Sequence, residues 1–535
     1  MKKLFQAVAL ITFFSILNRA AGFVFRIYLS RTIGAEALGL YQIALSIFFV
    51  LLTFVASGLP LIISRNTAKY STLKDYKKER SLMSASLIFS VILSVVLSIC
   101  VIIFKDVFKL LFTDEKAFQI LLILLPAVLI TAIFTVFRGW LWGKNNFFAV
   151  CFTEFVEQIV RIVLCVILLS SAFSFDGANA AALSLTLSCA FSLVLIIIFY
   201  FTSGGRFAKP ESIYKEVVKP STPITLVRVL TSLVQPVIAI IIPLRLVAAG
   251  YTNSQALSLY GVAMGMTVPF LFIPSAIIGS LSMALIPDLS SAVTKQDTGH
   301  ISNRITTSLL FTMLVSTLFV PLYIGAGQEI GIFFYDNILS GNLLVYSAWF
   351  MIPFGLTSIS SSILNALGLE LKSMKNYIVG AVIMLLCVWF LPAYIGINAL
   401  VWGMGICMVI AGFLNIRMIK KKTKINLKFL KPFLLMLAFI VPVTALVSFI
   451  TKILANYFNL FFTLAISCTV GAICFMLLAF VFNLISVDSI MILFKRNKKE
   501  KQAKREKRKT HLPSLFFFKI SNKKSNKKRV VIHPN

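Results

Sequence analysis

Charged residues are scarce in this sequence. Asp, Glu, Lys and Arg make up 13% of the 535 residues, whereas 59% are hydrophobic and the mean hydropathy is +0.93. An average soluble domain carries about 25% charged residues. This composition therefore excludes a soluble domain and predicts a polytopic membrane protein.

Histidine and patterned cysteine are also lacking. His300, His511 and His533 fall in a loop or the tail, which leaves no His in an apolar run for a proton relay or a metal site. The eight cysteines show no Cys-x-x-Cys spacing, so neither a disulfide framework nor a metal site is expected. No Walker motif or nucleophile constellation is found. We expect no enzyme, no ATP-driven pump and no cofactor, and a coupling ion, if one is used, is not identified.

Long apolar runs separated by short polar loops predict fourteen transmembrane helices. About 20 apolar residues at 1.5 Å each cross the hydrocarbon core of roughly 30 Å. No Ala-x-Ala-like cleavage site ends the first run, so we expect an uncleaved span rather than a signal peptide. The expected spans lie near residues 8–28, 39–63, 81–104, 119–142, 147–170, 179–202, 222–246, 257–286, 304–325, 342–367, 377–394, 396–416, 432–451 and 458–485.

Basic residues are unevenly divided between alternate loops. With the N-terminus inside, the inner segments before the tail hold 24 Lys and Arg, and the outer loops hold five. Cytoplasmic loops of membrane proteins carry such an excess of Lys and Arg. We therefore expect a multi-pass membrane protein with both termini in the cytoplasm.

The chain becomes strongly basic after the last span. Sixteen Lys and Arg lie in residues 495–535, about half of the formal net charge of +32. We expect residues 486–535 to form a disordered cytoplasmic tail that is drawn to anionic inner-leaflet lipids. Nucleic-acid binding is not expected.

Two segments of the chain resemble each other at a fixed offset. Residues 37–44 (ALGLYQIA) match residues 256–263 (ALSLYGVA), and the same offset places Arg26 on Arg245. We infer a duplication with lobes at 1–210 and 220–425, followed by an extra pair of spans at 426–485. Because each lobe has an even number of spans, their pseudo-two-fold axis is expected to lie along the membrane normal. Rocking-type alternating access suits this arrangement.

Arginines interrupt the apolar spans. Arg19 lies near the middle of the first span, where a charge costs at least a few kcal/mol unless it faces protein or a wet cavity. An arginine fork suits phosphate or pyrophosphate, so we expect a cationic pathway for an anion. Arg26 and Arg228 alternatively snorkel to the headgroups. The six arginines within or at the ends of spans are Arg19, Arg26, Arg138, Arg161, Arg228 and Arg245.

Acidic residues and helix breakers add structural candidates. Glu154, Glu157 and Arg161 share one helical stripe, and Glu157 can pair locally with Arg161 at i, i+4. Gly139-x-x-x-Gly143 permits close helix packing. Three prolines, which free backbone carbonyls and kink helices, are candidates for gating hinges or static kinks: Pro269, Pro274 and Pro287.

Several motifs together resemble a known family. The chain is similar to the stage V sporulation protein B group of polysaccharide-biosynthesis membrane proteins, over roughly residues 5–485. The motifs that carry the resemblance are Asn18-Arg19-x-x-Gly22-Phe23-x-x-Arg26, Arg31-x-x-Gly34-x-Glu36-x-x-Gly39-x-Tyr41, Gly58-Leu59-Pro60, Arg138-Gly139-x-x-x-Gly143, Glu157-Gln158-x-x-Arg161, Pro223-Ile224-Thr225-Leu226-x-Arg228 and Leu285-Ile286-Pro287.

The resemblance implies a fold, a function and a site. The group belongs to the multidrug/oligosaccharidyl-lipid/polysaccharide exporter superfamily, whose fold has fourteen helices in two lobes with alternating access. Related lipid II flippases turn undecaprenyl-pyrophosphate-linked precursors across the membrane with a cationic cavity. By resemblance, Arg19 is a cavity arginine. Where those flippases have an Arg-Asp pair this chain has Phe25 and Arg26, so the acidic partner is missing.

The expected function is therefore export of a lipid-linked saccharide, most readily a peptidoglycan precursor. Export of another lipid-linked polysaccharide, or cation-coupled multidrug export, is the alternative. A third hypothesis is a scaffold that recruits cell-wall synthesis enzymes through the basic tail. The resemblance implies a location in the bacterial plasma membrane. Substrate-binding candidates are Asn18, Arg19, Arg26, Arg138, Arg228 and Arg245; structural or gating candidates are Glu157, Gln158, Arg161, Pro269, Pro274 and Pro287.

Overall fold

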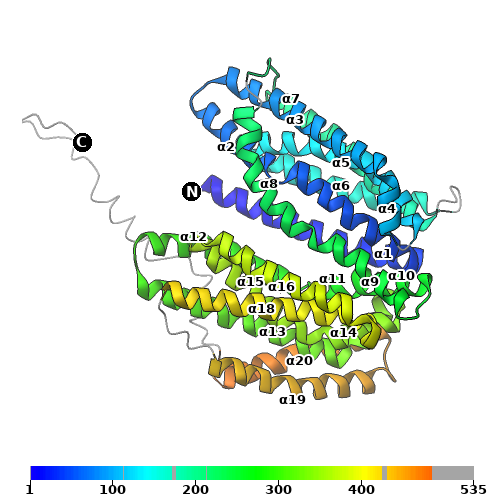
Figure 1. Ribbon diagram of the computed structural model, residues 1–535. Coiled ribbons are helices and arrows are strands. Elements are labelled where there is room, and N and C mark those ends of the chain that lie inside the picture. Colours follow the sequence, from blue (N-terminus) through cyan, green and yellow to red (C-terminus); the bar gives the residue numbers. More distant parts are fainter. Residues whose placement is uncertain are drawn as a thin grey trace, which may run out of the picture. The chain divides into compact units, whose positions relative to one another are not determined.

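The structure is a computed structural model that describes residues 2–112, 114–170, 176–211, 214–423, 430–482 and 484 (Figure 1). Every regular element in these ranges is a helix, which confirms the expected all-α fold. The chain divides into two compact units, Met1–Leu478 and Ala479–Asn535. The predicted basic tail, residues 486–535, lies outside the described residues.

The first part of the chain, coloured blue to cyan in Figure 1, forms one group of helices. Its elements are α1 (Lys2–Ala56), α2 (Leu59–Thr72), α3 (Tyr76–Ile103), α4 (Lys105–Leu111), α5 (Glu115–Gly143), α6 (Phe147–Leu168) and α7 (Gly177–Thr202). The first elements of the second part are η1 (Tyr214–Val218), α8 (Lys219–Ser232), α9 (Val234–Ala248), α10 (Asn253–Gly261), η2 (Val262–Thr267), α11 (Val268–Leu271) and α12 (Ser275–Thr294).

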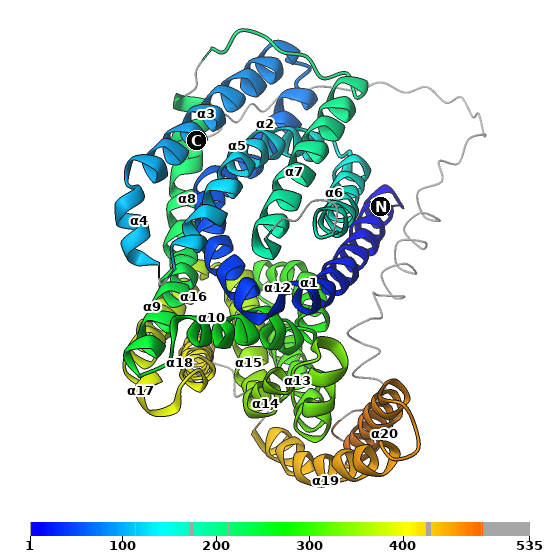
Figure 2. The same ribbon diagram turned by 90° about the vertical axis from the view of Figure 1, so that its right-hand side faces the viewer.

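The remaining helices come after α12 in the chain and are coloured green to orange (Figures 1 and 2). They are α13 (Thr298–Tyr335), α14 (Ile338–Ser347), η3 (Ala348–Phe350), α15 (Met351–Ala366), α16 (Glu370–Phe390), α17 (Pro392–Ile395), α18 (Asn398–Thr423), α19 (Leu430–Leu454) and α20 (Leu460–Val481). A Cβ on Gly325 of α13 or on Gly471 of α20 would meet Val447 of α19 within 2.8 Å. The last two helices therefore pack beside α13, while the domain boundaries expected from the sequence remain predictions.

The number of membrane crossings can be judged from the length and hydropathy of the helical stretches. Twelve stretches of the described residues are long and apolar enough to cross a membrane. The first, Leu10–Thr72, has 63 residues, about three times the length of one crossing, and α1 bends inside it at Gly34, where φ is 78°. The 22-residue α6 is not among the twelve, and it carries Glu154, Glu157 and Arg161. Fourteen crossings remain the prediction.

The expected continuous span over residues 257–286 is wrong. The chain there changes from α-helix to the π-helix η2, then to the short α11, and starts α12 after a turn that ends at Pro274. Proline lacks an N–H and its ring clashes with the preceding turn, so Pro269 and Pro274 interrupt regular hydrogen bonding. Pro287 lies within α12 and does not end it. The helix is interrupted around Pro269 and Pro274, whereas a kink at Pro287 and a role in gating stay predictions.

Contacts between turns show which loops share one end of the helices. Ser254 donates a hydrogen bond to Glu36 Oε2 at 2.6 Å, which joins the bend of α1 to the start of α10. The Arg31 guanidinium donates to the main-chain carbonyls of Phe333 and Phe334 at the end of α13. These loops are those expected outside the membrane. Their direction relative to the membrane stays a prediction.

The two similar segments of the sequence pack against each other. A Cβ built on Gly39 of α1 would lie 2.1 Å from the carbonyl oxygen of Leu257, and one on Gly261 would lie 2.0 Å from that of Ala35. Real Cβ atoms do not approach this closely, so both positions require glycine. The main chains of α1 and α10 therefore meet directly at this end, while the division into two lobes stays a prediction.

Small residues also hold α5 against α2. A Cβ on Gly139 would lie 2.9 Å from the Pro60 carbonyl oxygen, and one on Gly143 would lie 2.7 Å from Thr67 Cβ. The packing role expected for this Gly-x-x-x-Gly pair is confirmed.

A buried ion pair fastens the end of α5 to the start of α3. The Glu79 side chain is only 6% exposed, and its carboxylate lies 2.7 Å from Lys144 Nζ. The same carboxylate accepts a hydrogen bond from Trp140 Nε1 at 2.8 Å. Removing one partner of a buried pair leaves the other charge uncompensated.

Glu79→Ala is therefore expected to destabilise the protein by about 3 kcal/mol or more. Trp140 Nε1 would lose its acceptor while staying buried, and Lys144, which is 23% exposed, would lose its paired charge. The thermal unfolding midpoint in detergent measures the effect. Lys77→Ala is the control, because Lys77 forms an exposed pair with Glu211 at 3.3 Å, and such pairs contribute about 1 kcal/mol at most. Equal midpoints for the two variants would contradict the prediction.

Candidate functional site

A cavity of about 330 Å³ lies between α1 and α6. Arg19 stands on the first half of α1, 15 residues before the bend at Gly34, or about 22 Å along the helix. Its side chain is exposed to the cavity rather than packed in the helix bundle. The lining residues are Ile11, Phe14, Ser15, Asn18, Arg19, Cys151 and Glu154.

Asn18 and Arg19 are thus neighbours in the cavity wall, in agreement with their selection from the sequence. The Oδ1 atom of Asn18 is buried and has no hydrogen-bond partner among the described residues. An unpaired buried acceptor costs about 1–3 kcal/mol unless a ligand or water satisfies it. Their part in substrate binding stays a prediction.

Arg138 of α5 pairs with Glu154, one of the lining residues of the cavity. Its Nη1 lies 3.3 Å from Glu154 Oε1, and the guanidinium lies 5.0 Å from the centre of the Trp142 ring. The side chains of Arg138 and Glu154 are 25% and 35% exposed, so the pair is accessible. Through Glu154 the structure connects Arg138 with Arg19.

Glu157 and Arg161 form a second, separate pair one turn further along α6. Glu157 Oε1 accepts from Arg161 Nη2 at 2.6 Å, which confirms the local pair expected from their i, i+4 spacing. Arg161 Nε also contacts Ser188 of α7 at 3.4 Å. Gln158 faces α1, since its Nε2 lies 3.8 Å from where a Cβ on Gly22 would be. These contacts suit a structural role.

Arg26 does not line the cavity. Its side chain is partly buried and interacts electrostatically with Tyr41 and Tyr335, which are 4% and 3% exposed. Just before it, Phe23 packs on Phe270 with ring centres 5.1 Å apart. The seven-residue spacing from Arg19 therefore does not bring both arginines to this cavity, because Arg26 is not among its lining residues.

The structure gives Arg228 and Arg245 other partners. Arg228 Nη1 donates to the carbonyl oxygen of Ser57 at 3.0 Å, at the break between α1 and α2. Arg245 Nε donates to the carbonyl oxygen of Trp389 at 2.8 Å and lies over the Trp389 ring. Neither side chain lines the cavity at Arg19. Arg228 remains exposed at the surface, whereas Arg245 ties α9 to α16.

Sequence reasoning missed Tyr335, and it named Glu36 and Arg31 only as family motif residues, without their contacts to distant helices. Tyr335, Glu36 and Arg31 each lie near a predicted loop, where polar residues are ordinary. Tyr335 was assigned to a loop because the span was expected to end at residue 325, but α13 continues to that tyrosine. The long helix was obscured by Gln328 and Glu329, which interrupt its apolar run.

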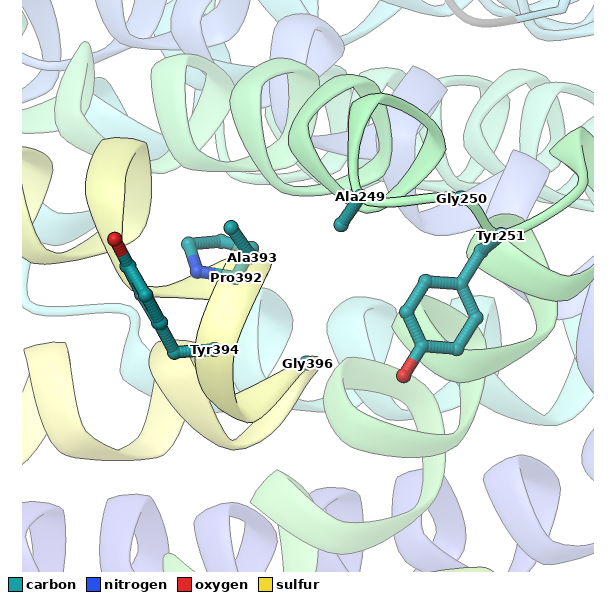
Figure 3. Close-up of a pocket in the computed structure, with 7 residues that line it drawn as sticks. All are labelled: Ala249, Gly250, Tyr251, Pro392, Ala393, Tyr394 and Gly396. Atoms are coloured by element: carbon teal, nitrogen blue, oxygen red, sulfur yellow. The ribbon is translucent and has the colours of Figure 1, made fainter.

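A second and shallower pocket, of about 220 Å³, lies at the ends of α9 and α17 (Figure 3). The rings of Tyr251 and Tyr394 stand on opposite sides of it (Figure 3). Its lining residues are Ala249, Gly250, Tyr251, Pro392, Ala393, Tyr394 and Gly396, and none of them is charged. The cavity at Arg19 is therefore the better candidate for an anionic ligand.

Similar sequences include transporters and sporulation proteins. Stage V sporulation protein B of Bacillus subtilis (strain 168) is 26% identical over 492 residues, which cover 88% of this chain and 94% of that protein. Lipid II flippase MurJ of the same organism is 22% identical over 424 residues, which cover 72% of this chain and 76% of that protein.

Solved structures confirm the fold. A structure of lipid II flippase MurJ in an inward closed conformation matches with a TM-score of 0.64 and 16% identity, over 89% of this chain and 98% of that one. An inward-facing multidrug resistance transporter of the MATE family matches with a TM-score of 0.63 and 18% identity, over 76% and 95%. The chain thus has the fold of MOP-superfamily transporters.

The family follows from the sequence model that the chain matches. The polysaccharide biosynthesis protein family matches residues 4–293, more than half of the 535 residues. The matched range contains every residue of the cavity at Arg19. Taken with the helical transporter fold, this match shows that the chain belongs to the polysaccharide biosynthesis protein family.

Proposed function

We propose that the protein is a flippase that moves an undecaprenyl-pyrophosphate-linked saccharide from the inner to the outer leaflet. The observation that carries the proposal is the cavity with Arg19 in its wall, and with Arg138 paired to Glu154 of the same wall, inside a transporter fold. Two guanidinium groups can bind the oxygens of a diphosphate, which is the group that such lipids share.

The proposed substrate is a peptidoglycan precursor such as lipid II. Its support is similarity to lipid II flippase MurJ, over 72% of this chain. Similarity to stage V sporulation protein B supports a role in sporulation. Transport involves no covalent step, so its driving force is the membrane potential, an ion gradient or consumption of the product outside.

The test is exposure of lipid II on the outer leaflet of cells that lack their other flippases. An externally added enzyme that cleaves only accessible precursor is applied with and without this protein. We expect cleavage to depend on the protein. No cleavage, with the protein folded and inserted, would contradict a peptidoglycan precursor as the substrate.

Multidrug export is the second candidate. The observation that favours it is Glu154, a carboxylate in the cavity wall that could attract a cationic drug. Against it, the carboxylate is already paired with Arg138. Efflux of a fluorescent cationic dye from cells expressing the protein, absent in the Glu154→Gln variant, would favour this candidate over the flippase.

A further inference from the structure

The cavity contains an acid that a binding site for an anion does not need. Glu154 lines the cavity with Arg19, and its carboxylate lies 3.3 Å from Arg138 Nη1. A fixed negative charge at this position repels phosphate and occupies the arginine that phosphate would use. Binding of a diphosphate does not by itself explain why a carboxylate lies at this position.

The pair is weaker than others on the same helix. Arginine–carboxylate hydrogen bonds are typically about 2.7–2.9 Å long and often bidentate. Arg138 and Glu154 make one contact of 3.3 Å, whereas Glu157 and Arg161 are 2.6 Å apart. Glu154 therefore holds Arg138 loosely.

Arg138 retains an unused donor. Its Nε is buried and has no hydrogen-bond partner among the described residues. The guanidinium is held from one face by the Trp142 ring, 5.0 Å away, which orients the fork without satisfying its donors. The exchangeable contact is the one at Nη1, where a single carboxylate oxygen lies 3.3 Å away and the side chain is 25% exposed.

We propose that Glu154 is a displaceable counterion that occupies the phosphate position in the empty transporter. The inference rests on the proposed function and deepens it. An incoming diphosphate offers more charge and more acceptor oxygens than one carboxylate, so it replaces Glu154 on Arg138 and also contacts Arg19. When the substrate leaves, Glu154 returns to Arg138 and helps release.

Competition between Glu154 and the diphosphate for Arg138 lowers the affinity for the substrate and speeds its release. Binding must include the cost of separating Glu154 from Arg138, and release regains the same interaction. Without the carboxylate, the anion would be held more tightly by Arg19 and Arg138. Tight binding in the ground state then slows the release that each cycle requires.

The experiment measures binding of undecaprenyl diphosphate to the purified full-length protein in lipid nanodiscs. Glu154→Gln keeps the size and polarity of the side chain and removes its charge. We expect it to bind about ten-fold more tightly than the wild type and to expose lipid II more slowly in cells. Glu370→Gln, the same charge change at an exposed position at the start of α16, is the matched control and should bind as the wild type does.

A double variant tests whether the two residues act as a pair. Arg138→Gln should bind more weakly than the wild type, and adding Glu154→Gln to it should restore little, because Glu154 then has no Arg138 to block. Glu154→Asp retains the charge and should stay close to wild-type affinity, which separates charge from folding defects.

The outcomes distinguish the two proposals. If the wild type binds undecaprenyl diphosphate and Glu154→Gln binds it equally well or more weakly, the counterion role is overturned. The proposed flippase function is not affected by that result. No binding of undecaprenyl diphosphate by any form, with all forms folded, would overturn the proposed function and the counterion with it.

Discussion

Replacing Arg19 with alanine is expected to lower outer-leaflet exposure of lipid II by about ten-fold to a hundred-fold. Arg19 is the exposed cation in the cavity wall, and a hydrogen bond to a charged group contributes about 1.5–3 kcal/mol. Each 1.4 kcal/mol is a factor of ten in binding or rate. The accessible-precursor cleavage assay measures the loss.

Two further substitutions make this result specific. Arg19→Lys keeps the charge without the fork, so it should retain part of the activity. Arg206→Ala removes an exposed arginine from the segment after α7 and should retain full activity. Wild-type exposure of lipid II in Arg19→Ala, with the protein folded in the membrane, would remove the cationic cavity from the mechanism.

A leucine at Gly39 is expected to abolish transport. The first added atom, Cβ, would lie 2.1 Å from the Leu257 carbonyl oxygen and 3.2 Å from the Gly261 nitrogen. These are main-chain atoms, which cannot rotate away as a side chain can, so α1 and α10 must separate. We expect at least a ten-fold loss of lipid II exposure and a lower thermal unfolding midpoint.

Gly279→Leu is the matched control for this substitution. Gly279 lies within α12, and a Cβ there meets nothing within 4 Å. It should therefore keep both activity and midpoint. Retention of activity in Gly39→Leu would mean that the crossing of α1 and α10 is not needed in the transport cycle.

The same crossing explains why two segments of the sequence look alike. Tyr41 and Tyr260 occupy matching positions and are 4% and 1% exposed. Both segments approach the partner helix through main chain, so small residues and a buried tyrosine are required twice. Alternating access predicts that this end opens as the lobes rock.

Local chemistry was enough to predict much of the fold. Backbone groups in lipid must be hydrogen-bonded within their own segment, so long apolar runs become helices wherever they pack. Glu157 and Arg161 pair at 2.6 Å because four residues bring side chains together on any α-helix. The Gly139 and Gly143 contact with α2 follows likewise from the lack of side chains.

Other features depended on contacts between residues far apart in the chain. Arg138 and Glu154 lie on different helices, and only packing of α5 against α6 brings them to 3.3 Å. Arg26 shares a helix with Arg19 but is enclosed near Tyr41 and Tyr335, which no spacing within the first span could predict.

The sequence by itself determined that this is a helical membrane protein with arginines in its spans, because hydrophobic length and charge act locally. The tertiary structure decided which arginines face a cavity and which are used to join helices. Arg19 lines the cavity, whereas Arg228 binds the Ser57 carbonyl and Arg245 binds that of Trp389. The reason is physical: a guanidinium in a membrane must find an acceptor, and only the folded chain determines whether a neighbouring helix supplies it.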